Sequence, residues 1–128
     1  MITADQLVLH AVGDYLLQSD WMATRKTKRW WPAAAHALTY GAPFLLLSPS
    51  WLALAVIVGT HAVIDRYRLA RWVVWARNEL LCPPAHEPRV KPGTPFPPET
   101  PEWLAGWLII IADNVIHVLI NGAALRWL

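Results

Sequence analysis

Four apolar stretches, each close to the length of a helix that crosses a lipid bilayer, dominate this sequence. They cover residues 2–22, 31–47, 51–75 and 103–127 of a chain of 128 residues. A bilayer core needs about 20 residues of helix, with a range of roughly 17 to 25. We therefore expect an all-α integral membrane protein, in which a four-helix bundle forms one transmembrane domain over residues 1–128.

The composition agrees with a membrane environment. Hydrophobic residues make up 55% of the chain and charged residues only 16%, against about 25% charged residues in soluble domains. The nine tryptophans favour places where one end of the side chain is apolar and the other is wet. A disordered chain is excluded by these values. The single cysteine excludes an intramolecular disulfide framework and a cysteine-rich zinc module.

Proline concentrates between the third and fourth stretches. Eight of the 11 prolines lie in residues 83–101. Because proline lacks a backbone N–H and breaks both helices and sheet interiors, this composition predicts an extended, polyproline-like segment. We expect a proline-rich cytoplasmic loop between helices three and four.

The basic residues predict an orientation. Ten of the 11 lysines and arginines lie either in the connection after the first stretch or between Arg66, near the end of the third stretch, and the start of the fourth. The positive-inside rule places both connections in the cytoplasm. We therefore expect a protein of the cytoplasmic membrane with both termini on the extracytoplasmic side and with membrane lipid as a partner.

A histidine and an aspartate recur four residues apart in three of the apolar stretches. This spacing puts both side chains on one helix face, one turn apart. In the fourth stretch the order is reversed, as a helix running the opposite way across the membrane requires. His36 of the second stretch is expected to face the same bundle interior. The three pairs are His10 with Asp14, His61 with Asp65, and Asp113 with His117.

These seven side chains are candidate metal ligands. An ionisable side chain within a bilayer costs at least about 2.5 kcal/mol and usually marks a functional site. Imidazole and carboxylate donors favour zinc, manganese or iron over calcium. Seven donors exceed the needs of one tetrahedral ion, so either two ions bind or some aspartates orient the histidines. Alternatively, the pairs only specify helix packing through hydrogen bonds.

Two arginines follow the third pair. Arg66 and Arg68 stand where the third helix is expected to leave the membrane. They either anchor the helix at an anionic lipid surface or bind a phosphate or carboxylate of a substrate. Gln18, one turn after Asp14, is a further candidate for substrate contact.

The motifs resemble a known family. The pattern His10-x-x-Gly-Asp-Tyr-x-x-Gln18, followed by Trp21, Lys26, His36 and Thr60-His-x-x-Ile-Asp-Arg66, resembles small bacterial and phage membrane proteins classed as a domain of unknown function. Some of these proteins are described as membrane-bound metal-dependent hydrolases. The resemblance runs through about Arg71, and it implies a metal site at the matched histidines and aspartates.

The leading functional hypothesis is a metal-dependent hydrolase that acts near the cytoplasmic interface. Asp14 or Asp65 would serve as the general base, and the substrate would be a lipid-like or small amphiphilic ester. One alternative is an ion- or proton-coupled transporter, for which a chain this small would form a homo-oligomer. Another is a non-catalytic phage or envelope interaction protein. No groove-reading motif accompanies the basic connections, so nucleic acid is not an expected partner.

Overall fold

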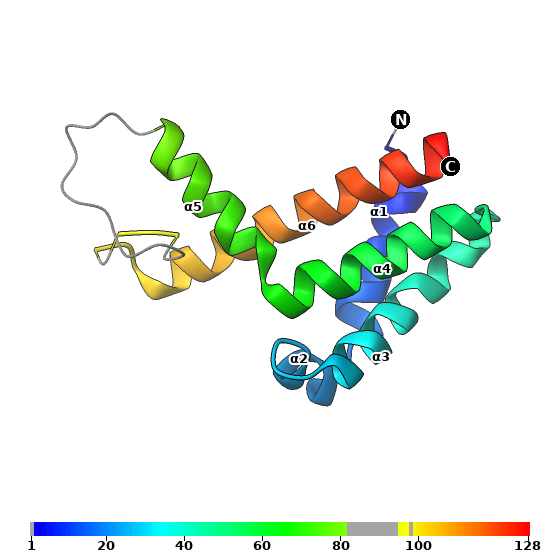
Figure 1. Cartoon of the computed structure of the whole chain (residues 1–128), viewed down its shortest axis with the longest axis horizontal. Helices are drawn as coiled ribbons and strands as arrows, with labels where there is room; N and C mark the ends of the chain where they lie inside the picture. The colour runs from blue at the N-terminus through cyan, green and yellow to red at the C-terminus, as the bar shows by residue number, and fades with distance from the viewer. Residues whose placement is uncertain (1, 82–94, 98) are drawn as a thin grey trace. The chain divides into compact units, whose positions relative to one another are not determined.

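A computed structural model describes residues 2–81, 95–97 and 99–128 (Figure 1). The regular elements of these residues are all helical, which confirms the all-α prediction for this part of the chain. A π-helix, Val12–Leu16, continues the first α-helix, and a 3-10 helix, Ala42–Leu47, continues the third. Most of the predicted proline-rich loop (residues 83–94 and 98) lies outside the described residues. The α-helices are α1 (Ala4–Ala11), α2 (Asp20–Arg25), α3 (Trp30–Gly41), α4 (Trp51–Tyr67), α5 (Leu69–Leu81) and α6 (Glu102–Trp127).

The chain divides into two compact units. The first comprises Met1–Tyr67 with Ile116–Leu128, and the second comprises Arg68–Val115. The first unit therefore contains α1 to α4 and the C-terminal half of α6. The second contains α5 and the N-terminal half of α6. Within the second unit, Asn78 Nδ2 donates a hydrogen bond of 2.7 Å to the carbonyl oxygen of Pro95.

The helix boundaries differ from the four single spans that the sequence predicts. The stretch 51–75 is two helices, because Arg68 adopts a left-handed φ of 53° between α4 and α5 and interrupts the α-helical ladder. The stretch 2–22 is also broken: after the π-helix, α2 begins at a new cap, where Ser19 Oγ accepts from the N–H of Met22. The last span, predicted at 103–127, agrees with α6 within one residue.

Helix α6 has the length and composition of a membrane span. It contains 26 residues, which at 1.5 Å per residue extend about 39 Å. Among the described helices it alone meets both criteria of length and apolar composition, and α4 follows with 17 residues. Core helices of soluble proteins share this property. The described residues thus support one candidate span and do not confirm the predicted four-span membrane bundle.

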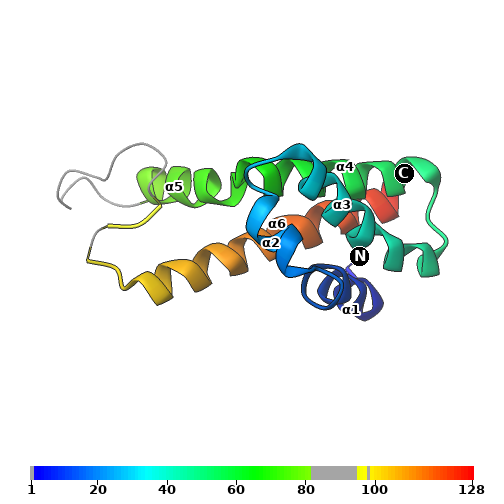
Figure 2. The ribbon, with the colours of Figure 1, turned by 90° about the horizontal axis from the view of Figure 1, so that it is seen from below.

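Helices α1, α3 and α4 pack closely in the first unit. Helix α3 runs beside α4 (Figure 1), whereas α1 crosses them and is seen end-on in Figure 2. Gly13 permits this crossing, because a Cβ at its position would lie 2.8 Å from the carbonyl oxygen of Tyr40. Gly41 permits the α3–α4 approach, because its Cβ would lie 2.4 Å from Val58 Cγ2.

The interior is unusually polar, and the exterior is unusually apolar. The buried apolar side chains include several alanines, while Leu16, Leu46 and Trp51 are 76%, 80% and 82% exposed. Buried polar groups are costly without partners, so their grouping points to a site. The buried polar residues are Gln6, His10, Asp14, His36, His61, Asp65, His117 and Asn121.

Candidate metal centre

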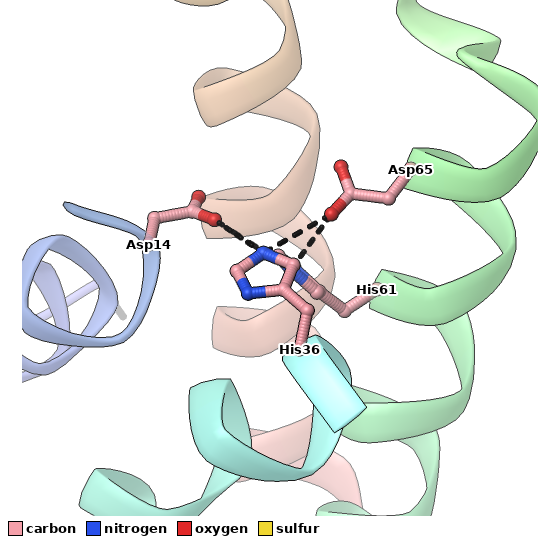
Figure 3. A group of neighbouring side chains, drawn as sticks. All are labelled: Asp14, His36, His61 and Asp65. Atoms are coloured by element: carbon pink, nitrogen blue, oxygen red, sulfur yellow. Dashed lines mark hydrogen bonds and ion pairs between the residues drawn. The ribbon is translucent and has the colours of Figure 1, made fainter. Parts of the chain in front are cut away.

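Two aspartates and two histidines from three elements point toward one another in the interior of the first unit (Figure 3). Asp14 comes from the π-helix, and π-helical turns occur frequently at functional sites. His36 comes from α3. His61 and Asp65 stand one turn apart on one face of α4, as their spacing predicts. All four side chains are buried.

The donor atoms of these side chains lie close together. His36 Nε2 is 3.0 Å from His61 Nε2, and it is 3.2 Å from both Asp14 Oδ1 and Asp65 Oδ2. His61 Nε2 is 3.6 Å from Asp14 Oδ1 and 3.2 Å from Asp65 Oδ2. We call Asp14, His36, His61 and Asp65 the four-donor cluster.

These spacings fit a tetrahedral metal site. Zinc binds nitrogen and oxygen ligands at about 2.0–2.1 Å, which puts neighbouring ligands of a tetrahedron about 3.3 Å apart. The five separations above run from 3.0 to 3.6 Å. Five of the six separations among the four donor atoms thus match the edge lengths that a single ion requires, and all four atoms lie within 4.8 Å of one another.

The chemistry of the four-donor cluster also favours a cation. Carboxylate oxygens only accept hydrogen bonds, and hydrogens on both imidazole Nε2 atoms would face each other across 3.0 Å. A positive ion between the four atoms is attracted by every lone pair. Among the described residues, the Nδ1 atoms of His36 and His61 have no hydrogen-bond partner, so the polar contacts of both rings concentrate on the Nε2 side.

Two predicted ligands flank the four-donor cluster. His10 Nε2 lies 3.7 Å from Asp14 Oδ2, the oxygen that faces away from the cluster. His117 Nε2 lies 3.8 Å from Asp65 Oδ1. Both separations exceed hydrogen-bond distance. Each carboxylate therefore presents one oxygen to the cluster and the other toward a histidine.

Tyr40 is a site residue that sequence reasoning missed. Its ring is stacked on His61 with 3.6 Å between centroids and 11° between planes. Its hydroxyl lies 2.8 Å from His10 Nδ1 and accepts a hydrogen bond of 2.5 Å from Asn121 Nδ2. The available signal was its position four residues after His36, on the same face of α3.

Lys26 is the second missed residue. Its ammonium nitrogen lies 2.8 Å from Asp65 Oδ2, and its side chain is 17% exposed. It therefore contacts the same carboxylate oxygen that faces the histidines. Lys26 is among the residues that carry the family resemblance, but its position in a connection between helices did not indicate a partner.

The remaining predicted residues are not part of the four-donor cluster. Asp113 is partly buried on α6, in the second unit, and Arg68 is exposed where that unit begins. Gln18 Oε1 is buried without a hydrogen-bond partner among the described residues. Arg66 donates to the carbonyl oxygens of Thr27 at 2.7 Å and Lys28 at 3.3 Å. Its guanidinium thus binds backbone in the connection between α2 and α3.

Fold and site together define an all-helical protein whose interior holds a two-histidine, two-aspartate cluster with the geometry of a metal site. Sequence comparison gives the family. The chain belongs to the family described as "Protein of unknown function (DUF3307)", which matches residues 2–83. This confirms the predicted membership of an uncharacterised family. No curated protein and no solved structure matches the chain. The matched range contains all of the four-donor cluster and Lys26.

Proposed function

We propose that this protein is a membrane-embedded metal-dependent hydrolase whose ion is held by the four-donor cluster. The observation that carries the proposal is the convergence of four buried donor atoms at the edge lengths of a tetrahedral metal site. Two imidazoles and two carboxylates favour zinc, manganese or iron. The four donors would hold one such ion, which can expand to five-coordinate and so accept a water or substrate oxygen as a further ligand.

The distribution of polar and apolar side chains supports the membrane environment. Eight polar side chains are buried, while large apolar side chains such as Leu16, Leu46 and Trp51 lie on the outside. Water-soluble proteins bury most of their large apolar side chains, so a broad exposed apolar surface marks contact with a partner or a membrane. Helix α6 adds a segment of spanning length.

The bound ion and the two aspartates take different roles in the proposed hydrolysis. A bound ion polarises the scissile bond and lowers the pKa of a water molecule to about 7. Asp14 and Asp65 each keep one oxygen directed away from the other donors, toward His10 and His117 respectively. One of these oxygens would accept the proton of the attacking water. A lipid-like or small amphiphilic ester is the proposed substrate.

Hydrolysis of model esters tests this proposal. The full chain is purified in detergent, stripped of metal with a chelator, and assayed with chromogenic carboxylic and phosphoric esters before and after zinc, manganese or iron is restored. We expect activity to vanish on stripping and to return with one of the ions. Asp65→Asn is expected to lose at least about 100-fold in rate, whereas Asp20→Asn, an exposed control, keeps it.

The alternative functions give different results. A protein that binds the ion but hydrolyses none of the esters, and that carries the ion across proteoliposomes, would be a transporter. Unchanged ester hydrolysis in Asp65→Asn would place the activity outside the four-donor cluster. Either result contradicts the proposed function.

A further inference from the structure

Among the described residues of the first unit, Lys26 is the one lysine or arginine paired with a carboxylate of the four-donor cluster. Its Nζ lies 2.8 Å from Asp65 Oδ2. That oxygen is also 3.2 Å from the Nε2 atoms of His36 and His61. Lys26 therefore stands at the edge of the proposed ion site, in contact with one of its ligands.

The net charge of the metal-bound cluster indicates that an anion is missing. Asp14 and Asp65 together balance a divalent ion, provided that the ligating imidazoles are neutral, as ligation requires. Counted over the four-donor cluster and Lys26 alone, the ammonium is then one positive charge in excess, on a side chain that is only 17% exposed. A largely buried charge without a counter-charge is destabilising. An anion beside the ion restores the balance.

Arg66 holds the backbone of the connection between α2 and α3, directly after Lys26. The guanidinium of Arg66 donates to the carbonyl oxygens of Thr27 and Lys28, and it lies 5.9 Å and 5.6 Å from the ring centroids of Trp30 and Tyr67. These contacts fix the residues directly after Lys26 to the end of α4. The backbone next to Lys26 is therefore held close to Asp65, within reach of the lysine side chain.

We propose that Lys26 and the ion together bind a phosphoryl group, which makes a phosphate ester the substrate class. This inference rests on the proposed metal centre. Lysine is a common phosphate ligand that acts as a point charge, and a phosphoryl group offers one oxygen to the ion and another to the ammonium. The phosphoryl group comes from a lipid headgroup or from a soluble phosphate.

Phosphorus NMR on the Mn²⁺-loaded full chain tests the inference. Inorganic phosphate is titrated into protein of known manganese content, and paramagnetic broadening of its ³¹P signal reports binding next to the ion. Lys26→Gln is expected to keep the metal but to weaken phosphate binding at least about tenfold, the effect of losing a charge-assisted hydrogen bond. Lys26→Arg should restore most of the affinity. Lys28→Gln, which removes an exposed lysine two residues away, should bind phosphate as the native chain does.

The outcomes separate this inference from the proposed function. Native protein that holds no metal overturns both. The inference alone is overturned if metal-loaded protein gives no saturable broadening of the phosphate signal, or if Lys26→Gln binds phosphate as tightly as the native chain. Loss of metal from Lys26→Gln also overturns it, as does binding of acetate as tightly as phosphate. Competition by short-chain phosphatidylglycerol identifies a lipid headgroup as the source. Binding of inorganic phosphate without such competition identifies a soluble phosphate.

Discussion

The ring of Tyr40 lies stacked on the ring of His61, with centroids 3.6 Å apart and planes 11° apart. The hydroxyl of Tyr40 accepts from Asn121 Nδ2, so its own hydrogen is available to His10 Nδ1 at 2.8 Å. This arrangement places the hydrogen of a neutral His10 on Nε2, which faces Asp14 Oδ2 at 3.7 Å. Tyr40 therefore orients two of the residues around the proposed ion.

Tyr40→Phe should separate the stacking of Tyr40 from its hydrogen bonds. The ring remains on His61, while His10 and Asn121 lose their shared partner. We expect metal affinity to fall about tenfold, because groups that orient metal ligands typically contribute 10- to 100-fold. Competition with a chelator of known affinity measures the change. Tyr15→Phe is the control, since Tyr15 is 60% exposed, and equal losses in both variants would contradict this role.

Two glycines should respond oppositely to alanine. At Gly13 a Cβ would lie 2.8 Å from both Tyr40 Cδ2 and the Tyr40 carbonyl oxygen, and overpacking costs about 1–3 kcal/mol. At Gly59, within α4, a Cβ would have no atom within 4 Å, and alanine stabilises a helix by about 0.8–1 kcal/mol over glycine. Thermal unfolding in detergent should show a lower Tm for Gly13→Ala and a higher Tm for Gly59→Ala. A Gly13→Ala variant as stable as the native chain would refute the close helix crossing.

Lys26→Gln should bind the ion more tightly than the native chain. The ammonium and the ion share Asp65 Oδ2 and repel each other, so removing the positive charge favours the ion. We expect a gain of several-fold to about tenfold in metal affinity, the size of a charge interaction in a partly buried site. Calorimetric titration of stripped protein measures it, with Lys28→Gln as the control. Weaker metal binding by Lys26→Gln would contradict the shared use of Asp65.

Arg66→Gln should loosen the connection that positions Lys26. The variant loses the donors to the carbonyl oxygens of Thr27 and Lys28, and we expect a loss of about 1–3 kcal/mol in stability. Phosphate affinity should fall with it, while metal content stays unchanged because Arg66 contacts none of the four donors. Arg29→Gln, at an exposed position in the same connection, is the matched control. Metal loss from Arg66→Gln would show that Arg66 acts on the ion site itself.

The sequence predicted those site residues whose relation depends on helix periodicity. His61 and Asp65 share a face of α4 because they are four residues apart, and Asp14 and His36 joined them because polar side chains in apolar helices turn inward. His10 was predicted as a ligand by the same rule. The structure also places His10 Nδ1 beside the hydroxyl of Tyr40, a contact that the spacing does not predict. The π-helix that carries Asp14 likewise lies outside a 3.6-residue pattern.

Helix periodicity, by contrast, could not predict the contacts between different elements. Lys26 meets Asp65 from the connection between α2 and α3, which Arg66 holds through hydrogen bonds to Thr27 and Lys28. No local pattern encodes these hydrogen bonds. The break at Arg68 likewise depends on a left-handed backbone at a residue type that seldom adopts it. Helix α6 was predicted within one residue because its apolar run is long and bounded by Pro101.

Ion content measured by elemental analysis tests the central claim most directly. The native full chain is purified without chelator, and circular dichroism verifies that it is folded. It should contain about one zinc, manganese or iron ion per chain. His61→Ala should contain none, and His61→Cys, which restores a metal-binding side chain, should regain an ion. A folded native chain without metal, or His61→Ala with native metal content, would contradict the account.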